Sequence, residues 1–202
     1  MIRAASASDP LRIAVLASGR GSNLAALIER LDSTVRIVAV ASNRADAVAL
    51  LRAQDADIET AIFPRGEDGA ERDRLLGDWL IERQVELVVL AGFMEILTPA
   101  FVGRLPAINV HPSLLPNFPG LRAWEQALEA GVSETGVTVH LVDAGLDTGS
   151  VLAQETVPVR PGDDAAALQE RIQAVEHRLL PDVVRRLAAD AIPASTPSEV
   201  VR

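Results

Sequence analysis

The chain has 202 residues, of which 49% are hydrophobic and 23% charged, a balance typical of a globular protein rather than a disordered one. Its formal net charge of -9 argues against a surface for nucleic acid or anionic membrane, and the lack of cysteine excludes disulfides, thiolate metal sites and a cysteine nucleophile. All 19 basic residues are arginine, which excludes a lysine Schiff base and the lysine of a P-loop.

The length predicts one domain over residues 1–202. We expect residues 1–11 to form a loose leader, because they lack the apolar segment of a signal peptide. Residues from about 190 to 202 are expected to form a loose tail. No apolar stretch is long enough to cross a bilayer, and we expect a cytoplasmic protein.

Apolar runs alternate with helical periodicity through the first half of the chain. The predicted strands cover residues 12–17, 35–41, 58–63, 86–91 and 107–110. The predicted helices cover residues 22–31, 45–54, 69–83 and 99–104. This alternation predicts an α/β fold with a Rossmann-like, mostly parallel twisted sheet and helices on both of its faces.

The pattern changes in the second half. A helix is predicted over residues 122–130, followed by strands over 134–142 and 151–159 that a glycine-rich loop joins. We expect these two strands to form an antiparallel pair. A long helix over residues 164–189 completes the predicted fold.

A glycine-rich loop, Ser18-Gly19-Arg20-Gly21-Ser22-Asn23-Leu24, follows the first strand and opens a helix. Unpaired N–H groups at such a helix start bind anions, although many loops of this kind are only tight turns. Leu24 stands where the dinucleotide fingerprint has its third glycine, so a single phosphate monoester fits better than a pyrophosphate. The candidate phosphate-binding residues are Gly21, Ser22 and Asn23.

Asn109 and His111 lie at the end of the strand that Pro112 terminates. Side chains alternate along a strand, so these two residues share a face. They place an amide and a titratable base at the carboxyl end of a strand, which is where open α/β sheets bind their ligands.

These motifs carry a family resemblance. The pattern N-x-H-P-S-L-L-P, from Asn109 to Pro116, with the later Leu146-Asp147-Thr148-Gly149, is similar to the signature of folate-dependent formyltransferases. The glycine-rich loop resembles the substrate-phosphate loop of the glycinamide ribonucleotide formyltransferases. The resemblance continues in order over about residues 12–185, which makes it highly specific.

The resemblance implies transfer of the formyl group of 10-formyltetrahydrofolate to the amine of glycinamide ribonucleotide, a step of de novo purine biosynthesis. The amine would attack directly through a tetrahedral oxyanion, with no metal. Asn109 and a protonated His111 would donate to the oxyanion, while Asp147 would favour the charged form of His111 and order a water that relays the proton. Asp143 competes with Asp147 for this role but fits a turn-forming aspartate better. The partners would be small molecules and no nucleic acid or membrane, with the protein a monomer or a homodimer.

Glu176 falls inside the apolar stripe of the last helix, where a carboxylate needs partners. The resemblance implies that it holds the ribose hydroxyls, with Gln173 one turn earlier reaching the phosphate. A structural ion pair is the alternative. Gly92, Met94 and Pro112 complete the expected substrate-binding residues.

The resemblance further implies a folate-binding set consisting of Glu95, Ile96, Leu97, Val142 and Leu146. Two positions depart from the family pattern. Glu95 stands where a basic residue is common, and Arg122 where histidine is frequent. We expect Thr138 and His140, which share a strand face, to support the site from behind, although an ordinary core histidine is the alternative for His140.

Three other functions are alternatives for a sequence with these motifs. A formyltetrahydrofolate deformylase would use a similar Asn, His and Asp set to deliver water, but usually carries an additional N-terminal regulatory domain. A methionyl-tRNA formyltransferase would need a C-terminal RNA-binding domain. A nucleotide-binding regulatory module would explain the glycine-rich loop but would leave Asn109, His111 and Asp147 without a role.

Overall fold

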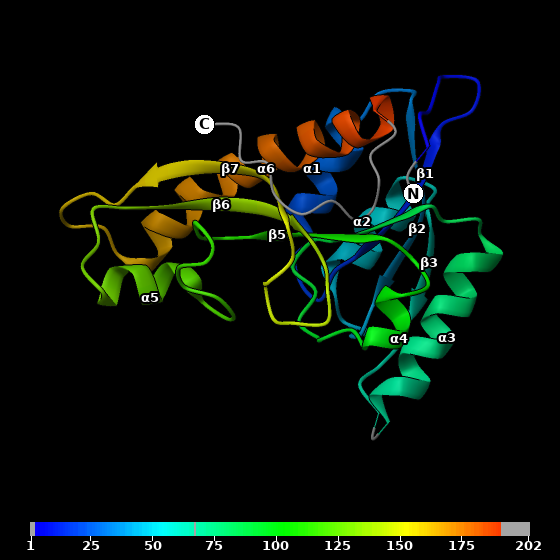
Figure 1. Ribbon diagram of the computed structural model, residues 1–202, viewed down its shortest axis with the longest axis horizontal. Helices are drawn as coiled ribbons and strands as arrows, with labels where there is room; N and C mark the ends of the chain where they lie inside the picture. The colour runs from blue at the N-terminus through cyan, green and yellow to red at the C-terminus, as the bar shows by residue number, and fades with distance from the viewer. Residues whose placement is uncertain (1–2, 67, 191–202) are drawn as a thin grey trace.

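The computed structural model describes residues 3–66 and 68–190, and this part of the chain forms one seven-stranded sheet (Figure 1). The strands are β1 (Leu11–Leu16), β2 (Val35–Ser42), β3 (Glu59–Ile62), β4 (Leu87–Leu90), β5 (Ala107–His111), β6 (Glu134–Leu141) and β7 (Val151–Pro158). The helices are α1 (Ser22–Arg30), α2 (Val48–Asp55), α3 (Gly69–Glu82), α4 (Pro99–Val102), α5 (Ala123–Glu129) and α6 (Ala165–Ala189).

The strand order is β3-β2-β1-β4-β5-β6-β7, and the first five strands in this order are parallel. The predicted mostly parallel sheet is therefore confirmed. The order reverses between β1 and β4, which makes the crevice at their carboxyl ends the expected ligand site.

The predicted antiparallel pairing of β6 and β7 is also confirmed, but β6 additionally runs antiparallel to β5. This second pairing places Asn109 opposite His140 and His111 opposite Thr138. The antiparallel direction thus brings side chains from the second half of β6 beside Asn109 and His111 of β5. Figure 1 shows β6 and β7 side by side, with α5 at their outer end.

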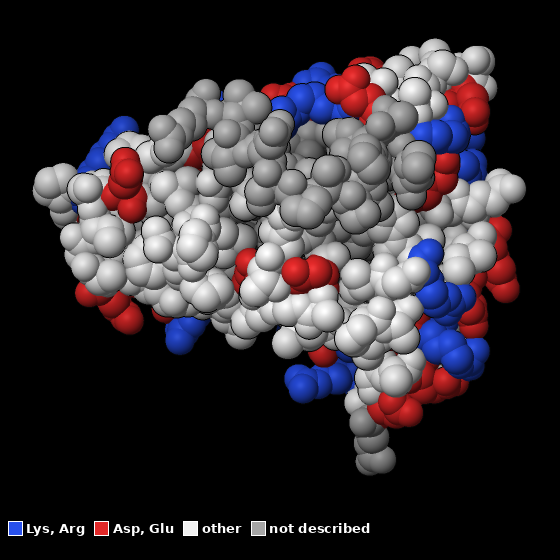
Figure 2. Space-filling model, in the orientation of Figure 1, with Lys and Arg blue, Asp and Glu red and all other residues white. Residues whose placement is uncertain are grey.

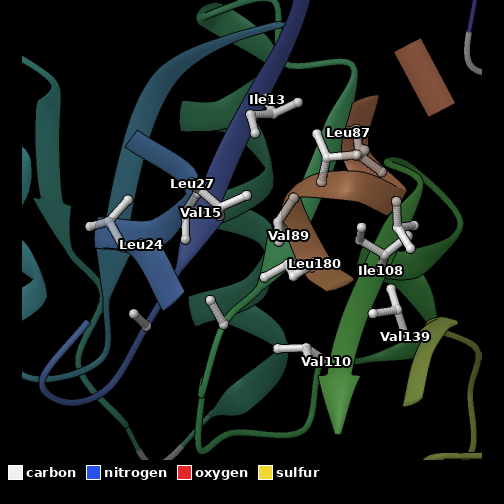
Figure 3. Packing of buried hydrophobic residues seen from close by; sticks show 14 of the residues in the cluster. Ile13, Val15, Leu24, Leu27, Leu87, Val89, Ile108, Val110, Val139 and Leu180 are labelled. Atoms are coloured by element: carbon white, nitrogen blue, oxygen red, sulfur yellow. The ribbon is translucent and has the colours of Figure 1, made fainter. Parts of the chain in front are cut away.

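The two faces of the sheet bury different side chains. Ile13 and Val15 of β1 belong to the core cluster that includes α1 and α6, whereas Ala14 and Leu16 belong to the cluster that includes α3 and α4. The alternation of side chains along a strand produces this division. Figure 3 shows the first cluster, in which β-branched and leucine side chains of the strands meet Leu180 of α6.

Residues 3–10, expected to be part of a loose leader, contact the domain. The Arg3 guanidinium forms ion pairs with Asp9 and with Glu86, at 2.9 and 2.7 Å. The backbone N–H of Ala5 donates to the carbonyl oxygen of Ala188 at 2.7 Å. β1 begins at Leu11, one residue before the predicted strand. The expected tail lies outside the described residues from 191 onward.

Basic and acidic side chains alternate on the exposed face of α3, at the lower right of Figure 2. Arg74 pairs there with Glu71 at 2.7 Å and with Asp78 at 2.9 Å. Exposed ion pairs of this kind contribute little to the free energy of unfolding. Within the described ranges, no helix combines the length and apolar character needed to cross a membrane.

Candidate active site

A cleft of about 1090 Å³ opens at the carboxyl ends of β1, β4 and β5. Its walls are the glycine-rich loop after β1, the segment after β4, the end of β5, the loop between β6 and β7, and one face of α6. Its lining includes every predicted substrate-binding, folate-binding and catalytic residue. Only Thr138, predicted as a supporting residue, lies away from the cleft wall.

Asn109, His140 and Asp147 meet at one point of this cleft. The Nδ2 amide of Asn109 lies 3.1 Å from Nε2 of His140 and donates to Oδ1 of Asp147 at 3.4 Å. Nδ1 of His140 lies 2.8 Å from the carbonyl oxygen of Leu141, which can only accept, so Nδ1 carries the proton. In the neutral ring Nε2 is then an acceptor for the Asn109 amide.

His111 is buried beside the same carboxylate. Its Nδ1 lies 3.4 Å from Oδ2 of Asp147, and its Nε2 lies 2.9 Å from the carbonyl oxygen of Phe118. Because that carbonyl can only accept, Nε2 carries a proton and the neutral ring presents a free lone pair on Nδ1. Asn109, His111 and Asp147 are therefore brought together, as the sequence predicted.

The sequence predicts a protonated His111, but the buried environment favours the neutral imidazole. Burial lowers the pKa of His111, while the Phe118 carbonyl and the Asp147 carboxylate only partly offset that effect. The resemblance led us to expect that Asp147 would keep His111 protonated. Asp147 acts in that direction, but removal of the imidazolium from water has the larger effect.

Asp147 is held as a carboxylate. Burial on its own would raise the pKa of Asp147, but the nearby His140 imidazole and the hydrogen bond from the backbone N–H of Gly120 lower it overall. The Gly120 N–H donates to Oδ2 at 2.8 Å. The rival Asp143 instead accepts bonds from Gly145 and Thr148 inside its own loop, as a turn-forming aspartate does.

The glycine-rich loop is shaped by packing as well as by its place at a helix start. Gly21 has a φ of 69° and precedes α1, and a Cβ on it would lie 2.7 Å from Cα of Ala49 in the neighbouring helix. Ser22 is the first residue of α1 and lines the cleft. α1 has no side-chain cap, because its N-cap residue is Gly21, and the Asn23 side chain bonds to a residue of α6.

That residue is Glu176, which is buried and lines the cleft. Asn23 Nδ2 donates to Glu176 Oε2 at 3.0 Å, and among the described residues no cation lies within ion-pair distance of this carboxylate. The alternative of a structural ion pair therefore has no support in the described part of the chain. Burial raises the pKa of Glu176 to about 7, despite the opposing effect of the Asn23 hydrogen bond. Gln173 lies on the same cleft wall.

The expected folate-binding residues divide into three kinds. Ile96 and Leu146 are exposed at the cleft, with exposed fractions of 69% and 53%. Leu97 and Val142 line the cleft and also pack into the core. Glu95 differs from both kinds, because its carboxylate bonds to Arg72 and Asn43 rather than standing free for a ligand. Gly92, Met94 and Pro112, expected on the substrate side, also line the cleft.

Thr138 supports the loop that follows β5. Its hydroxyl donates to the carbonyl oxygen of Ser113 at 2.7 Å and accepts from the backbone N–H of Leu115 at 3.1 Å. Gln154 of β7 donates to the same hydroxyl at 2.9 Å. Sequence reasoning missed Gln154, Arg72 and the backbone groups of Phe118 and Gly120. No sequence motif marks backbone donors and acceptors, because every residue type carries them.

Comparison with known proteins agrees with this geometry. Residues 11–184 match the family described as formyl transferase. The chain is 41% identical over 181 residues to the phosphoribosylglycinamide formyltransferase of Haemophilus influenzae, covering 86% of this chain and 85% of that protein. It is 45% identical over 192 residues to the trifunctional purine biosynthetic protein adenosine-3 of Drosophila pseudoobscura, covering 90% of this chain but only 14% of that much longer protein.

The fold agrees as well. The crystal structure of glycinamide ribonucleotide transformylase 1 from Symbiobacterium toebii superposes with a TM-score of 0.85 at 40% sequence identity, covering 89% of this chain and 88% of that one. The family match spans most of the chain, and the bacterial relative is matched over most of its own length. This chain therefore belongs to the formyl transferase family.

Proposed function

We propose that this protein transfers the formyl group of 10-formyltetrahydrofolate to the amine of glycinamide ribonucleotide, as a step of purine biosynthesis. The observation that carries the proposal is the convergence of Asn109, His111 and Asp147 in the cleft that Glu176 and the glycine-rich loop also line. One cleft thus holds groups suited to acyl transfer, to ribose hydroxyls and to a phosphate.

The ribonucleotide fits the side of the cleft formed by α1 and α6. Backbone N–H groups at the start of α1 favour the phosphate, and the macrodipole of the helix adds to the attraction. Among the described residues only Asn23 donates a hydrogen bond to Glu176, so this carboxylate has acceptor capacity left for two ribose hydroxyls. This unmet capacity on a buried carboxylate supports the ribose assignment.

The folate fits the side formed by the segment after β4 and the loop between β6 and β7. Met94 and Ile96 are 57% and 69% exposed there, and Leu146 faces the same cleft. Apolar side chains exposed around a concave site with a few polar groups are typical of pockets for flat organic ligands. When bound, the folate would supply the formyl carbon that the amine attacks.

The chain's own residues would stabilise charge and move one proton. The 3.4 Å contact between Asn109 and Asp147 is long for an N–H···O bond, so a formyl oxygen that gains negative charge can replace it. His111, neutral near pH 7, would accept the amine proton on Nδ1 and return it to the departing folate nitrogen. Asp147 would stabilise the imidazolium that forms between these two steps.

The direct test is a formyl-transfer assay with both substrates, with omission of the ribonucleotide as the control. We expect formylated ribonucleotide in the complete reaction and no loss of the formyl group from the folate when the ribonucleotide is left out. Release of formate at a comparable rate without the ribonucleotide would identify a hydrolase instead.

A further inference from the structure

A buried arginine on α3 reaches the segment that lines the folate side of the cleft. The Arg72 side chain is only 6% exposed, and its guanidinium contacts Asp73 at 2.7 Å and Glu95 at 3.1 Å. The two carboxylates are 1% and 12% exposed. Such a buried cluster is costly unless every charge has a partner, and here one cation lies between two anions.

The same glutamate is tied to the ends of β1 and β2. Asn43 Nδ2 donates to Glu95 Oε1 at 3.0 Å, and the Ser18 hydroxyl donates to Asn43 Oδ1 at 2.6 Å. The backbone N–H of Met94 donates to the Ser18 hydroxyl at 2.8 Å. The Glu95 carboxylate therefore connects the ends of β1 and β2 with α3.

Backbone groups of the segment after β4 enter the network too. Arg72 Nη2 donates to the carbonyl oxygen of Ile96 at 3.2 Å, and the backbone N–H of Thr98 donates to Asp73 Oδ2 at 2.6 Å. Four residues of the segment 94–98 are thus fixed by hydrogen bonds. Met94 bonds to Ser18 and Thr98 to Asp73. Glu95 bonds to Asn43 and Arg72, and Ile96 bonds to Arg72. The apolar side chains of Met94 and Ile96 remain exposed at the cleft.

We propose that Arg72 and Glu95 are positioning residues for the folate, which set residues 94–98 in the conformation that the ligand meets. This inference rests on the proposed function. It also gives the Glu95 carboxylate a role, because this carboxylate joins the cation of α3 to the strand ends. Arg65, whose side chain is 80% exposed and lies 3.8 Å from Glu95, adds little to this pair.

The test moves the cation of the cluster from position 72 to position 95. Arg72→Met removes the cation that two buried carboxylates share, and Glu95→Arg places a second cation beside Arg72. The double variant Arg72→Met/Glu95→Arg restores one cation and one anion, Asp73, to the cluster. We expect each single variant to raise KM for the formyl donor at least about tenfold and the double variant to recover most of that loss. If a single variant fails to fold, Glu95→Gln replaces it in the comparison, because it keeps the shape of the side chain and removes only the charge.

The readouts separate positioning from general stability. KM for the ribonucleotide should change less than about twofold in the Glu95 variants, and calorimetry with tetrahydrofolate should show the same loss as KM for the donor. Arg74→Met, which breaks only exposed ion pairs on the same helix, is the matched control and should leave both KM values unchanged.

Two results would overturn the inference. One is a lowered melting temperature with an unchanged KM for the formyl donor. The other is an equal rise in KM for both substrates. A wild-type protein that binds tetrahydrofolate but transfers no formyl group would instead refute the proposed function and leave the folate-binding comparison among variants intact.

Discussion

Asn109 and His140 face each other across the antiparallel strands β5 and β6, with the amide nitrogen 3.1 Å from Nε2 of the imidazole. The proton on Nδ1 of His140, fixed by the Leu141 carbonyl, makes Nε2 an acceptor. The Asn109 amide is therefore held with its NH₂ group toward His140 and Asp147. In the proposed mechanism, His140 thus determines which end of the Asn109 side chain points toward the formyl group.

His140→Ala should consequently reduce kcat without affecting substrate binding directly. Loss of an orienting partner for a catalytic group typically costs 10–100-fold, and we expect kcat to fall within roughly this range while both KM values change little. Steady-state kinetics with each substrate varied separately will show this. A kcat equal to that of the wild type would mean that the pairing orients nothing.

Removal of the proposed catalytic groups themselves should have larger effects. In the proposed mechanism Asn109→Ala eliminates a donor to the developing oxyanion, and we expect kcat to fall by at least about a hundredfold. Asp147→Asn keeps the shape and an acceptor for the Gly120 N–H, yet removes the charge that stabilises a protonated His111, so kcat should also fall by about a hundredfold. Calorimetry should find ribonucleotide binding retained in both variants. Turnover close to normal in both would exclude the assigned roles.

The titration of His111 gives an independent check. Burial lowers the pKa of His111 in the folded protein, so the imidazole should be neutral at pH 7 and should protonate only at a pH below its ordinary value of 6.5. The unfolded chain then binds the proton first, and this residue makes the protein less stable as the pH falls through 6.5. Because Asp147 opposes the shift, Asp147→Asn should lower the pKa of His111 further. NMR titration of the ring, assigned with His111→Asn, measures both values.

Glu176 should make stability and ribonucleotide affinity depend on pH in opposite directions. Its pKa rises from 4.5 to about 7 on folding, so the unliganded protein should lose stability, on the order of 3 kcal/mol, as the pH rises from 4.5 to 7. In the proposed role, ribose hydroxyls would donate to the ionised form, so affinity should increase over the upper part of that range. Glu176→Gln should remove both contributions, and melting curves and calorimetry of the two proteins at pH 5.5 and 8 will show whether it does. The same pH dependence of the melting temperature in the wild type and in Glu176→Gln would contradict this assignment.

Gly21→Ala should lower the stability of the folded protein even in the absence of any ligand. The new Cβ would lie 2.7 Å from Cα of Ala49, and the φ of 69° is itself unfavourable for alanine by about 1–2 kcal/mol. The melting temperature should therefore drop by several degrees, whether or not the loop binds phosphate. Gly19→Ala, which would meet nothing within 4 Å, is the matched control in the same loop. Equal stability of the two variants would contradict the packing argument.

The sequence was sufficient for the parallel part of the sheet and for the main members of the site. Hydrophobic periodicity predicts β1, β4 and β5, and the side-chain alternation that puts Asn109 and His111 on one face follows from the strand alone. The antiparallel pairing of β6 with β5 could not be predicted in the same way. It depends on which strands become neighbours, and it is this pairing that places His140 against Asn109.

Charge states and ion pairs between distant residues could not be predicted from the sequence, because they also depend on tertiary packing. The expected protonated form of His111 considered its carboxylate neighbour but not its burial, which only the packed structure determines. Arg72 gave no signal, because an arginine on an amphipathic helix is usually exposed. Its burial becomes evident only when Glu95, 23 positions along the chain, is found beside it.

The hydrogen bond from Ala5 to Ala188 joins the segment before β1 to the end of α6. The described fold is thus closed by a backbone hydrogen bond between its first and last segments. In a variant that keeps only residues 3–190, a linker could join residue 190 to residue 3, and new ends could be opened at the turn around Gly131, between α5 and β6. The order in which the elements are synthesised would change, while the neighbours of every strand would stay the same.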